Sequence, residues 1–127
     1  MAIRTELNLR LANSPGALAG VCQLLSDERV NILEMSLEAS GQLRIVVDNH
    51  VHAGAVLRDH HHQVSERDVI VLALPNSPGG LATILRLVGD ASVNLDYAYG
   101  GAADGSTTAS VVIGVDEPQR AAAAAGV

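Results

Sequence analysis

A six-residue sequence occurs twice in this chain of 127 residues. The two copies are Asn13-Ser14-Pro15-Gly16-Ala17-Leu18 and Asn76-Ser77-Pro78-Gly79-Gly80-Leu81. A second pair, Val30-Asn31-Ile32 and Val93-Asn94-Leu95, repeats at the same offset. Two matches at the same sequence offset indicate an internal duplication. We therefore predict two copies of one unit, over residues 1–68 and 69–127.

Each predicted unit is small enough that a lone hydrophobic core would be marginal, so the two units are expected to pack on each other. The composition supports a folded core, because 48% of the residues are hydrophobic and only 17% are charged. Aromatic residues amount to 2%, namely Tyr97 and Tyr99. The core must therefore consist of Leu, Val, Ile and Ala.

Apolar periodicity predicts strand, helix, strand, strand, helix, strand in the first unit. Residues 5–11 alternate, with Leu7, Leu9 and Leu11 predicted to face the core and Glu6, Asn8 and Arg10 to face away. A helix should begin at Pro15, capped by Ser14 or Asn13, and bury Leu18, Val21, Cys22, Leu24 and Leu25. Strands at residues 30–37 and 43–47 follow, the first with Ile32, Met35 and Leu37 partly inward, and then a helix at 52–61.

Residues 63–74 form an extended run long enough for two strands, the last of the first unit and the first of the second. The second unit then repeats the order, with a helix at 78–89, strands at 94–99 and 107–115, and a longer turn at 100–106. An alanine-rich helix after Pro118 reaches Val127. The second unit therefore has no room for its final strand.

The repeated loop could bind an anion. A strand that turns through Asn-Ser-Pro-Gly into a helix exposes free backbone N–H groups at the positive end of the helix dipole, which favours a carboxylate. Gly16 and Gly79 would let a ligand approach the backbone. The alternative is an ordinary capped turn, which duplication alone does not exclude.

Asn31 and Asn94 each follow the first asparagine of their loop by 18 residues. The strand, the N-x-P-G-x-L turn, the helix and then V-N-[IL] resemble the ACT domain, a small ligand-binding regulatory module. The resemblance covers the whole chain as two tandem copies and includes the run Val93-Asn94-Leu95-Asp96-Tyr97-Ala98-Tyr99. It is greatest to the stand-alone bacterial proteins made of two ACT units.

The resemblance implies an α+β fold of two ferredoxin-like βαββαβ units, commonly joined in one sheet of about eight strands, or seven if the last strand is absent here. It also implies that an amino acid or similar effector binds at the interface between units. The loops 13–18 and 76–81 of one unit would contact the effector, together with the second-strand residues of the neighbouring unit, Asn31, Ile32, Asn94 and Leu95. A homodimer and a regulated enzyme as partner are further implications. The serine-sensing members have a histidine where this chain has Leu11 and Leu74. This difference argues against serine as the effector. A partner chain is expected to cover the sheet edge that the missing strand leaves.

Tyr97 and Tyr99 share one face of their strand because side chains alternate. They could stack on a ligand or simply pack across strands. We take Met35 and Leu37 as their counterparts in the first unit, so that the tyrosine-bearing site is the one expected to bind.

The remaining features exclude several functions. A net charge of −6 disfavours nucleic acid, and no apolar run approaches a membrane span. The single cysteine, Cys22, suits a reducing compartment and a core position. We expect a cytoplasmic protein with no cofactor.

The five histidines, His50, His52, His60, His61 and His62, lack ligand spacing for a metal and are expected to form a solvated helix end.

Three functions stay open from the sequence. An effector-binding regulatory protein is expected, and a ligand-free oligomerisation or interaction module is the alternative. An enzyme is disfavoured because only Glu34, Asp96 and scattered histidines could act.

Overall fold

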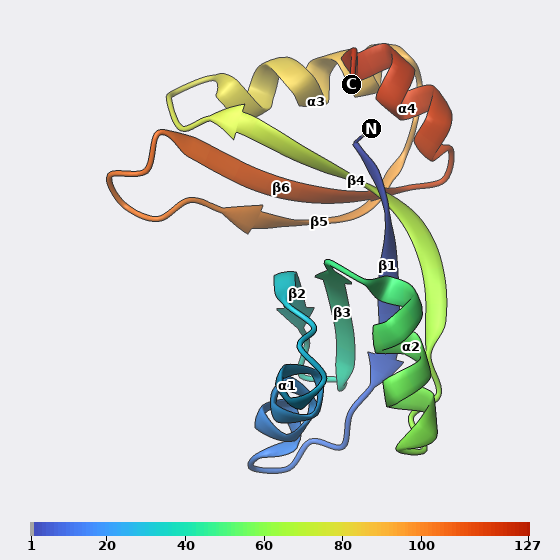
Figure 1. Cartoon of the computed structure of the whole chain (residues 1–127). Helices are drawn as coiled ribbons and strands as arrows, with labels where there is room; N and C mark the ends of the chain where they lie inside the picture. The colour runs from blue at the N-terminus through green and yellow to red at the C-terminus, as the bar shows by residue number, and fades with distance from the viewer. Residues whose placement is uncertain (1) are drawn as a thin grey trace. The chain divides into compact units, whose positions relative to one another are not determined.

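The computed structural model describes residues 2–127 and divides into two compact units (Figure 1). The first unit comprises residues 5–67, and the second comprises residues 68–127 together with residues 2–4. The division falls within two strands, β1 (Ile3–Arg10) and β4 (Ser65–Pro75). Each unit therefore takes a short piece of a strand whose remainder belongs to the other unit.

The order of elements repeats the predicted pattern. In the first unit β1 is followed by α1 (Ala17–Asp27), β2 (Ile32–Leu37), β3 (Gln42–Val47) and α2 (His50–Asp59). In the second, β4 is followed by α3 (Gly80–Asp90), β5 (Leu95–Gly101), β6 (Thr108–Val115) and α4 (Pro118–Ala125). β3 pairs antiparallel with β1 and β2, as β6 does with β4 and β5. The predicted tandem ferredoxin-like fold is confirmed.

Residues 2–127 contain six strands, where the sequence predicted seven. The extended run that was expected to form two strands is the single strand β4 of 11 residues. No strand follows α4 in the described chain, as predicted.

The core of the first unit is built by the predicted alternation of β1. Leu7, Leu9 and Leu11 are buried together with Val21 and Leu25 of α1, Leu43 and Ile45 of β3, and Ala53 and Leu57 of α2. Cys22 is half-buried. Apolar side chains of this size each contribute about 1.5–3 kcal/mol when fully buried, so this cluster is the main source of the unit's stability.

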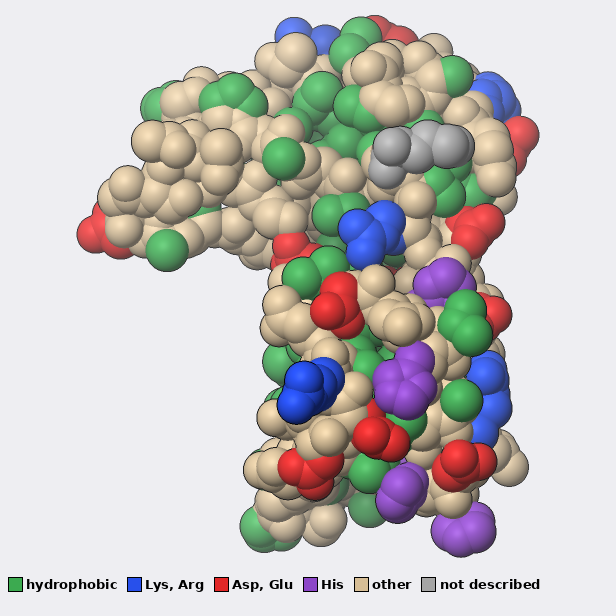
Figure 2. All heavy atoms as spheres, viewed as in Figure 1, with side chains coloured by type: hydrophobic (Ala, Val, Ile, Leu, Met, Phe, Trp, Pro, Cys, Tyr) green, Lys and Arg blue, Asp and Glu red, His purple; other side chains and the backbone are tan. Residues whose placement is uncertain are grey.

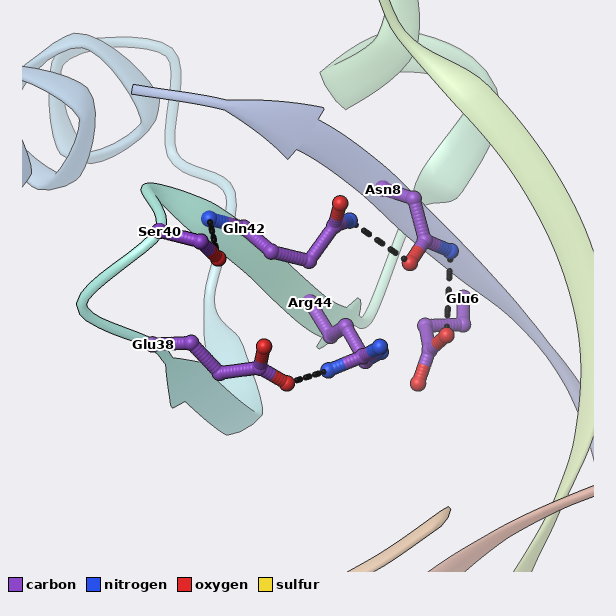
Figure 3. Close-up of polar contacts among 6 residues, drawn as sticks. All are labelled: Glu6, Asn8, Glu38, Ser40, Gln42 and Arg44. Atoms are coloured by element: carbon purple, nitrogen blue, oxygen red, sulfur yellow. Dashed lines mark hydrogen bonds and ion pairs between the residues drawn. The ribbon is translucent and has the colours of Figure 1, made fainter. Parts of the chain in front are cut away.

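Glu6 alternates with the core leucines of β1, as predicted, but its place on the opposite face does not expose it to solvent. Its side chain is fully buried and accepts a hydrogen bond from the Asn8 amide at 3.0 Å, while Gln42 donates to Asn8 at 3.3 Å (Figure 3). Arg44, which pairs in register with Asn8, forms an ion pair with Glu38. A buried polar group needs such partners. Asn8 is close to Glu6 in the sequence, but the Gln42 side chain that bonds to Asn8 is on β3 and distant in sequence. Periodicity alone therefore could not have found this polar face.

Two helices begin later than predicted. Their N-cap residues are glycines in the left-handed conformation, Gly16 with φ 83° and Gly79 with φ 87°, and no side chain caps either helix. The backbone folds into a turn over the Asn-Ser-Pro segment instead of starting the helix at proline. The proposed capping by Asn13 or Ser14 is therefore wrong. α2, by contrast, begins earlier than predicted, because the Asn49 side chain accepts from the backbone N–H of His52 at 3.2 Å.

Each of the four helices in residues 2–127 is followed within two residues by a residue with positive φ, namely Arg29, His61, Ser92 and Gly126. At the end of α2, for example, His61 N–H donates to Arg58 and His62 N–H donates to Leu57, both at 3.0 Å. This is the hydrogen-bond pair of a Schellman motif, which satisfies carbonyls that the helix leaves without partners.

Residues 2–4 lie along β4 on the side opposite β6. The Ala2 carbonyl accepts from Val71 N–H at 2.9 Å, and Ala2 and Ile3 pack against the core of the second unit. The expectation that this sheet edge needs a partner chain is therefore wrong. The N-terminal residues take the place of the missing last strand. Because Ala2 and Val71 are far apart in the sequence, local sequence patterns cannot predict this pairing.

Candidate functional site

The first copy of the repeated loop borders a cavity of about 190 Å³ within the first unit. The opposite wall is the β2–β3 turn. The cavity is lined by Leu11, Ala12, Asn13, Ser14, Gly16, Ala17, Leu18 and Ala19 on one side and by Leu37, Glu38, Ala39 and Gly41 on the other. Five of the six predicted residues of this loop line the cavity, and Pro15 does not.

The β2–β3 turn holds the loop in place through Gly41. Leu11 N–H donates to the Gly41 carbonyl at 2.7 Å. Gly41 has φ +91°, and a Cβ there would lie 2.2 Å from the Leu11 carbonyl oxygen. Only glycine allows this approach. Sequence reasoning missed this wall of the site, although a glycine between two strand patterns was a signal that could have found it.

The first turn of α1 offers backbone donors to the cavity. Ala17 N–H makes a 3.3 Å bond to Ser14, and Gly20 N–H bonds to Gly16 at 2.9 Å. Within residues 2–127 no acceptor is found for the N–H groups of Leu18 and Ala19, both of which line the cavity. A helix start with free donors carries a partial positive charge, and an acidic group binds there favourably.

The second copy of the loop borders a separate cavity of about 240 Å³ within the second unit. Its lining comprises Leu74, Pro75, Asn76, Ser77, Leu81, Gly100, Gly101, Ala102, Ala109 and Val111. Pro78, Gly79 and Gly80 do not line it.

The two loop asparagines differ in their hydrogen bonds. Asn76 donates from its side chain to the Ser106 carbonyl at 2.8 Å and from its backbone to Thr107 at 3.1 Å. The Asn76 amide nitrogen is thus used to tie its loop to the β5–β6 turn. Asn13 is exposed, and its side chain makes no hydrogen bond with the part of the chain that the structure describes. The two sites are therefore chemically different.

The structure does not bring Asn31 or Asn94 into the cavity of its own unit. The Asn31 backbone N–H donates to the Asp48 carboxylate at 3.0 Å, and its carbonyl accepts from Asp48 N–H at 3.1 Å. The Asn31 and Asn94 side chains are exposed at the starts of β2 and β5. Ile32 is half-buried against the first core, and Leu95 is 39% exposed.

Tyr97 and Tyr99 stack on each other, with ring centroids 6.2 Å apart and planes inclined by 16°. In the β5–β6 register they lie opposite Gly114 and Val112, which alternate with the core residues Val111 and Ile113. Both tyrosines therefore occupy the sheet face away from the second core. Tyr99 also borders a small hollow with Leu81 and Ala98.

The predicted equivalence of the tyrosines with Met35 and Leu37 is wrong. Glu34 pairs with Val46 and Ser36 with Arg44, so Glu34 and Ser36 hold the corresponding places in the first unit. The repeat offset gives the same correspondence, since 97 − 63 = 34 and 99 − 63 = 36, and the shift in register lies at the same place in both strands.

The edge strand β2 exposes apolar side chains. Met35 and Leu37 lie on the core side of the sheet, opposite Ile45 and Leu43, but remain 40% and 44% exposed. Their predicted inward orientation is correct in direction, yet α1 does not cover them. An edge strand with exposed apolar residues is a natural place for another chain to pair.

In residues 2–127 no group of three or more His, Cys, Asp or Glu side chains is arranged to hold a metal ion. No helix in the described chain combines the length and apolar character needed to cross a membrane.

Comparison with known proteins gives a consistent result. A family model described as an ACT domain pair matches residues 1–125. Protein BT0572 from Bacteroides thetaiotaomicron is 29% identical, with a TM-score of 0.85 over 97% of this chain and 86% of that one. The ligand-free regulatory subunit of aspartate kinase from Thermus thermophilus is 17% identical, with a TM-score of 0.71 over 99% and 91%. No curated protein matches this chain.

Proposed function

Because the chain belongs to the family of ACT domain pairs, we propose that it is a regulatory protein that binds a small effector. The effector is an amino acid, and its binding changes how the protein associates with itself or with a regulated enzyme. The observation that carries the proposal is the cavity between the first loop and the β2–β3 turn, with free helix N–H groups at its wall.

We place the amino acid in the first unit and not at the tyrosine-bearing site expected from the sequence, because Tyr97 and Tyr99 do not line the cavity beside the second loop. A cavity of about 190 Å³ far exceeds the roughly 10–15 Å³ of cavity volume that one water molecule needs, so it has room for a small ligand such as an amino acid. The effector's carboxylate accepts from the N–H groups of Leu18 and Ala19, where the helix dipole is favourable. The Asn13 side chain lies at the same cavity and orients the polar end of the ligand.

A second subunit completes the site in this proposal. β2 lies at the edge of the first unit's strand order and borders the cavity through Leu37. Pairing of β2 with a strand of another copy would cover Met35 and Leu37 and present that copy's Asn31 or Asn94 to the ligand. Burying apolar surface at an edge is a common basis of subunit association.

The exposed β2 edge also supports a second function, a ligand-free interaction module. In that case the edge would hold subunits together and the cavity would be incidental. The two functions differ in whether any small molecule stabilises the protein.

We expect one amino acid to raise the unfolding temperature in a screen of all twenty, because a ligand at 100 times its Kd adds about 2.7 kcal/mol of stability. Ala19→Asp should abolish this shift. The new carboxylate would occupy the helix start in place of the ligand, while favouring the helix by about 0.3–1 kcal/mol.

Ala82→Asp is the matched control, since Ala82 holds the same position in α3. It should keep the thermal shift. A shift that survives in both variants would place the ligand elsewhere, and no shift with any amino acid would favour the interaction module.

A further inference from the structure

A second hollow of about 390 Å³ lies in the first unit near the end of α2. Its lining residues are Arg10, His61, His62 and Gln63. None of them lines the effector cavity. All four side chains can donate N–H hydrogen bonds, and no Asp or Glu among the described residues lines the hollow. In a protein of net charge −6, this hollow gathers several N–H donors around one cationic side chain, Arg10.

Hydrogen bonds position three of the four lining residues, His61, His62 and Arg10. The Schellman motif that ends α2 positions His61 and His62 through their bonds to Arg58 and Leu57. Arg10 ends β1 and donates from one guanidinium nitrogen to the Ser40 carbonyl at 3.3 Å. In Figure 2 the visible histidine side chains lie over α2 and the segment after it. The hollow is therefore formed where the ends of β1 and α2 meet.

We propose that this hollow binds a phosphate group, either free or carried by a small molecule. A guanidinium has five N–H donors in a planar fork that matches a phosphate, and the bond to Ser40 leaves the others available. The two imidazoles and the Gln63 amide add donors from a second side. A metal ion is a poor occupant, because the lining has no carboxylate or thiolate and Arg10 would repel it.

In the described part of the second unit, the places of Arg10, His61 and His62 hold residues without donor side chains. Ala73 holds in β4 the place that Arg10 holds in β1, with Ser110 opposite Ala73 and Gln42 opposite Arg10. The helix α4 ends in the same motif, but with Gly126 and Val127 where α2 has His61 and His62. The donors are thus an addition of the first unit and not a requirement of the fold.

The test is a titration of the full-length protein with inorganic phosphate, followed by the NMR signals of the His61 and His62 side chains. Chloride and acetate at the same ionic strength serve as comparison ions. We expect saturable shifts with phosphate only. Arg10→Ala should weaken binding at least about tenfold, the effect of losing one charge-assisted contact of about 1.5 kcal/mol or more.

His61→Gly should weaken binding while keeping the fold, since glycine suits the φ of +70° at this position. His52→Ala, a change nearer the start of α2, should leave binding unchanged. Equal shifts with chloride, or unaltered binding in Arg10→Ala, would overturn the proposal. Tighter binding of glycerol phosphate than of inorganic phosphate would identify a phosphorylated small molecule, and equal binding would identify free phosphate. Neither result depends on an amino acid binding to the effector cavity.

Discussion

Replacing Gly41 by alanine is expected to lower the free energy of unfolding of the first unit by about 3 kcal/mol. The left-handed φ of +91° penalises any side chain, and the new Cβ would lie 2.2 Å from the Leu11 carbonyl oxygen. The backbone cannot move aside without stretching the 2.7 Å bond from Leu11 N–H to Gly41. Urea denaturation of the two proteins measures the difference.

Gly105→Ala provides the matched control. Gly105 lies between β5 and β6, as Gly41 lies between β2 and β3, and has φ +80°, but a Cβ at this position would meet no atom within 4 Å. It should show only the conformational cost of about 1–2 kcal/mol. Equal losses in the two variants would mean that the close approach of Gly41 to Leu11 contributes nothing.

Removing residues 2–4, so that Met1 precedes Thr5, is expected to destabilise the second unit by about 3 kcal/mol, from lost apolar burial and one lost backbone hydrogen bond. Ala2 and Ile3 pack against the second core, and Ala2 accepts from Val71 N–H. Amide hydrogen exchange reports the effect residue by residue. Val71 N–H should lose its protection first.

The first unit supplies the internal control for this truncation. Amides of the β1–β3 ladder, such as Leu9 and Leu43, should exchange at unchanged rates, because their pairing does not involve residues 2–4. Unchanged protection of Val71 in the shortened protein would show that the N-terminal residues do not act as the last strand of the second unit.

The sequence predicted the fold well where the signal was local or repeated. The alternation of Leu7, Leu9 and Leu11 identified the buried face of β1, and the duplicated loop identified two units with the same element order. These features follow from side-chain periodicity, which one strand or helix displays by itself.

Features that depend on distant residues were not predictable in the same way. The burial of Glu6 requires polar neighbours from β1 and β3, and the last strand of the second unit comes from the opposite end of the chain. The helix starts failed for a different reason. Asn13 and Ser14 are common capping residues, but the left-handed Gly16 moves the helix start beyond their reach.

The candidate site was predicted in part. The loop residues from Asn13 to Leu18 were singled out by repetition, and most of them line the cavity. The opposite wall was missed because Gly41 matters through its closeness to Leu11, a contact across two strands. The contribution of Asn31 and Asn94 to a neighbouring site stays a prediction.

The most direct test of the effector-binding account is an NMR titration of the ¹⁵N-labelled protein with the amino acid that gives the largest thermal shift. The account predicts that the amide signals of Leu18 and Ala19 move most, and that those of Leu81 and Ala82 at the start of α3 move little. Shifts confined to α3, or spread over the molecule without a maximum at the start of α1, would contradict it.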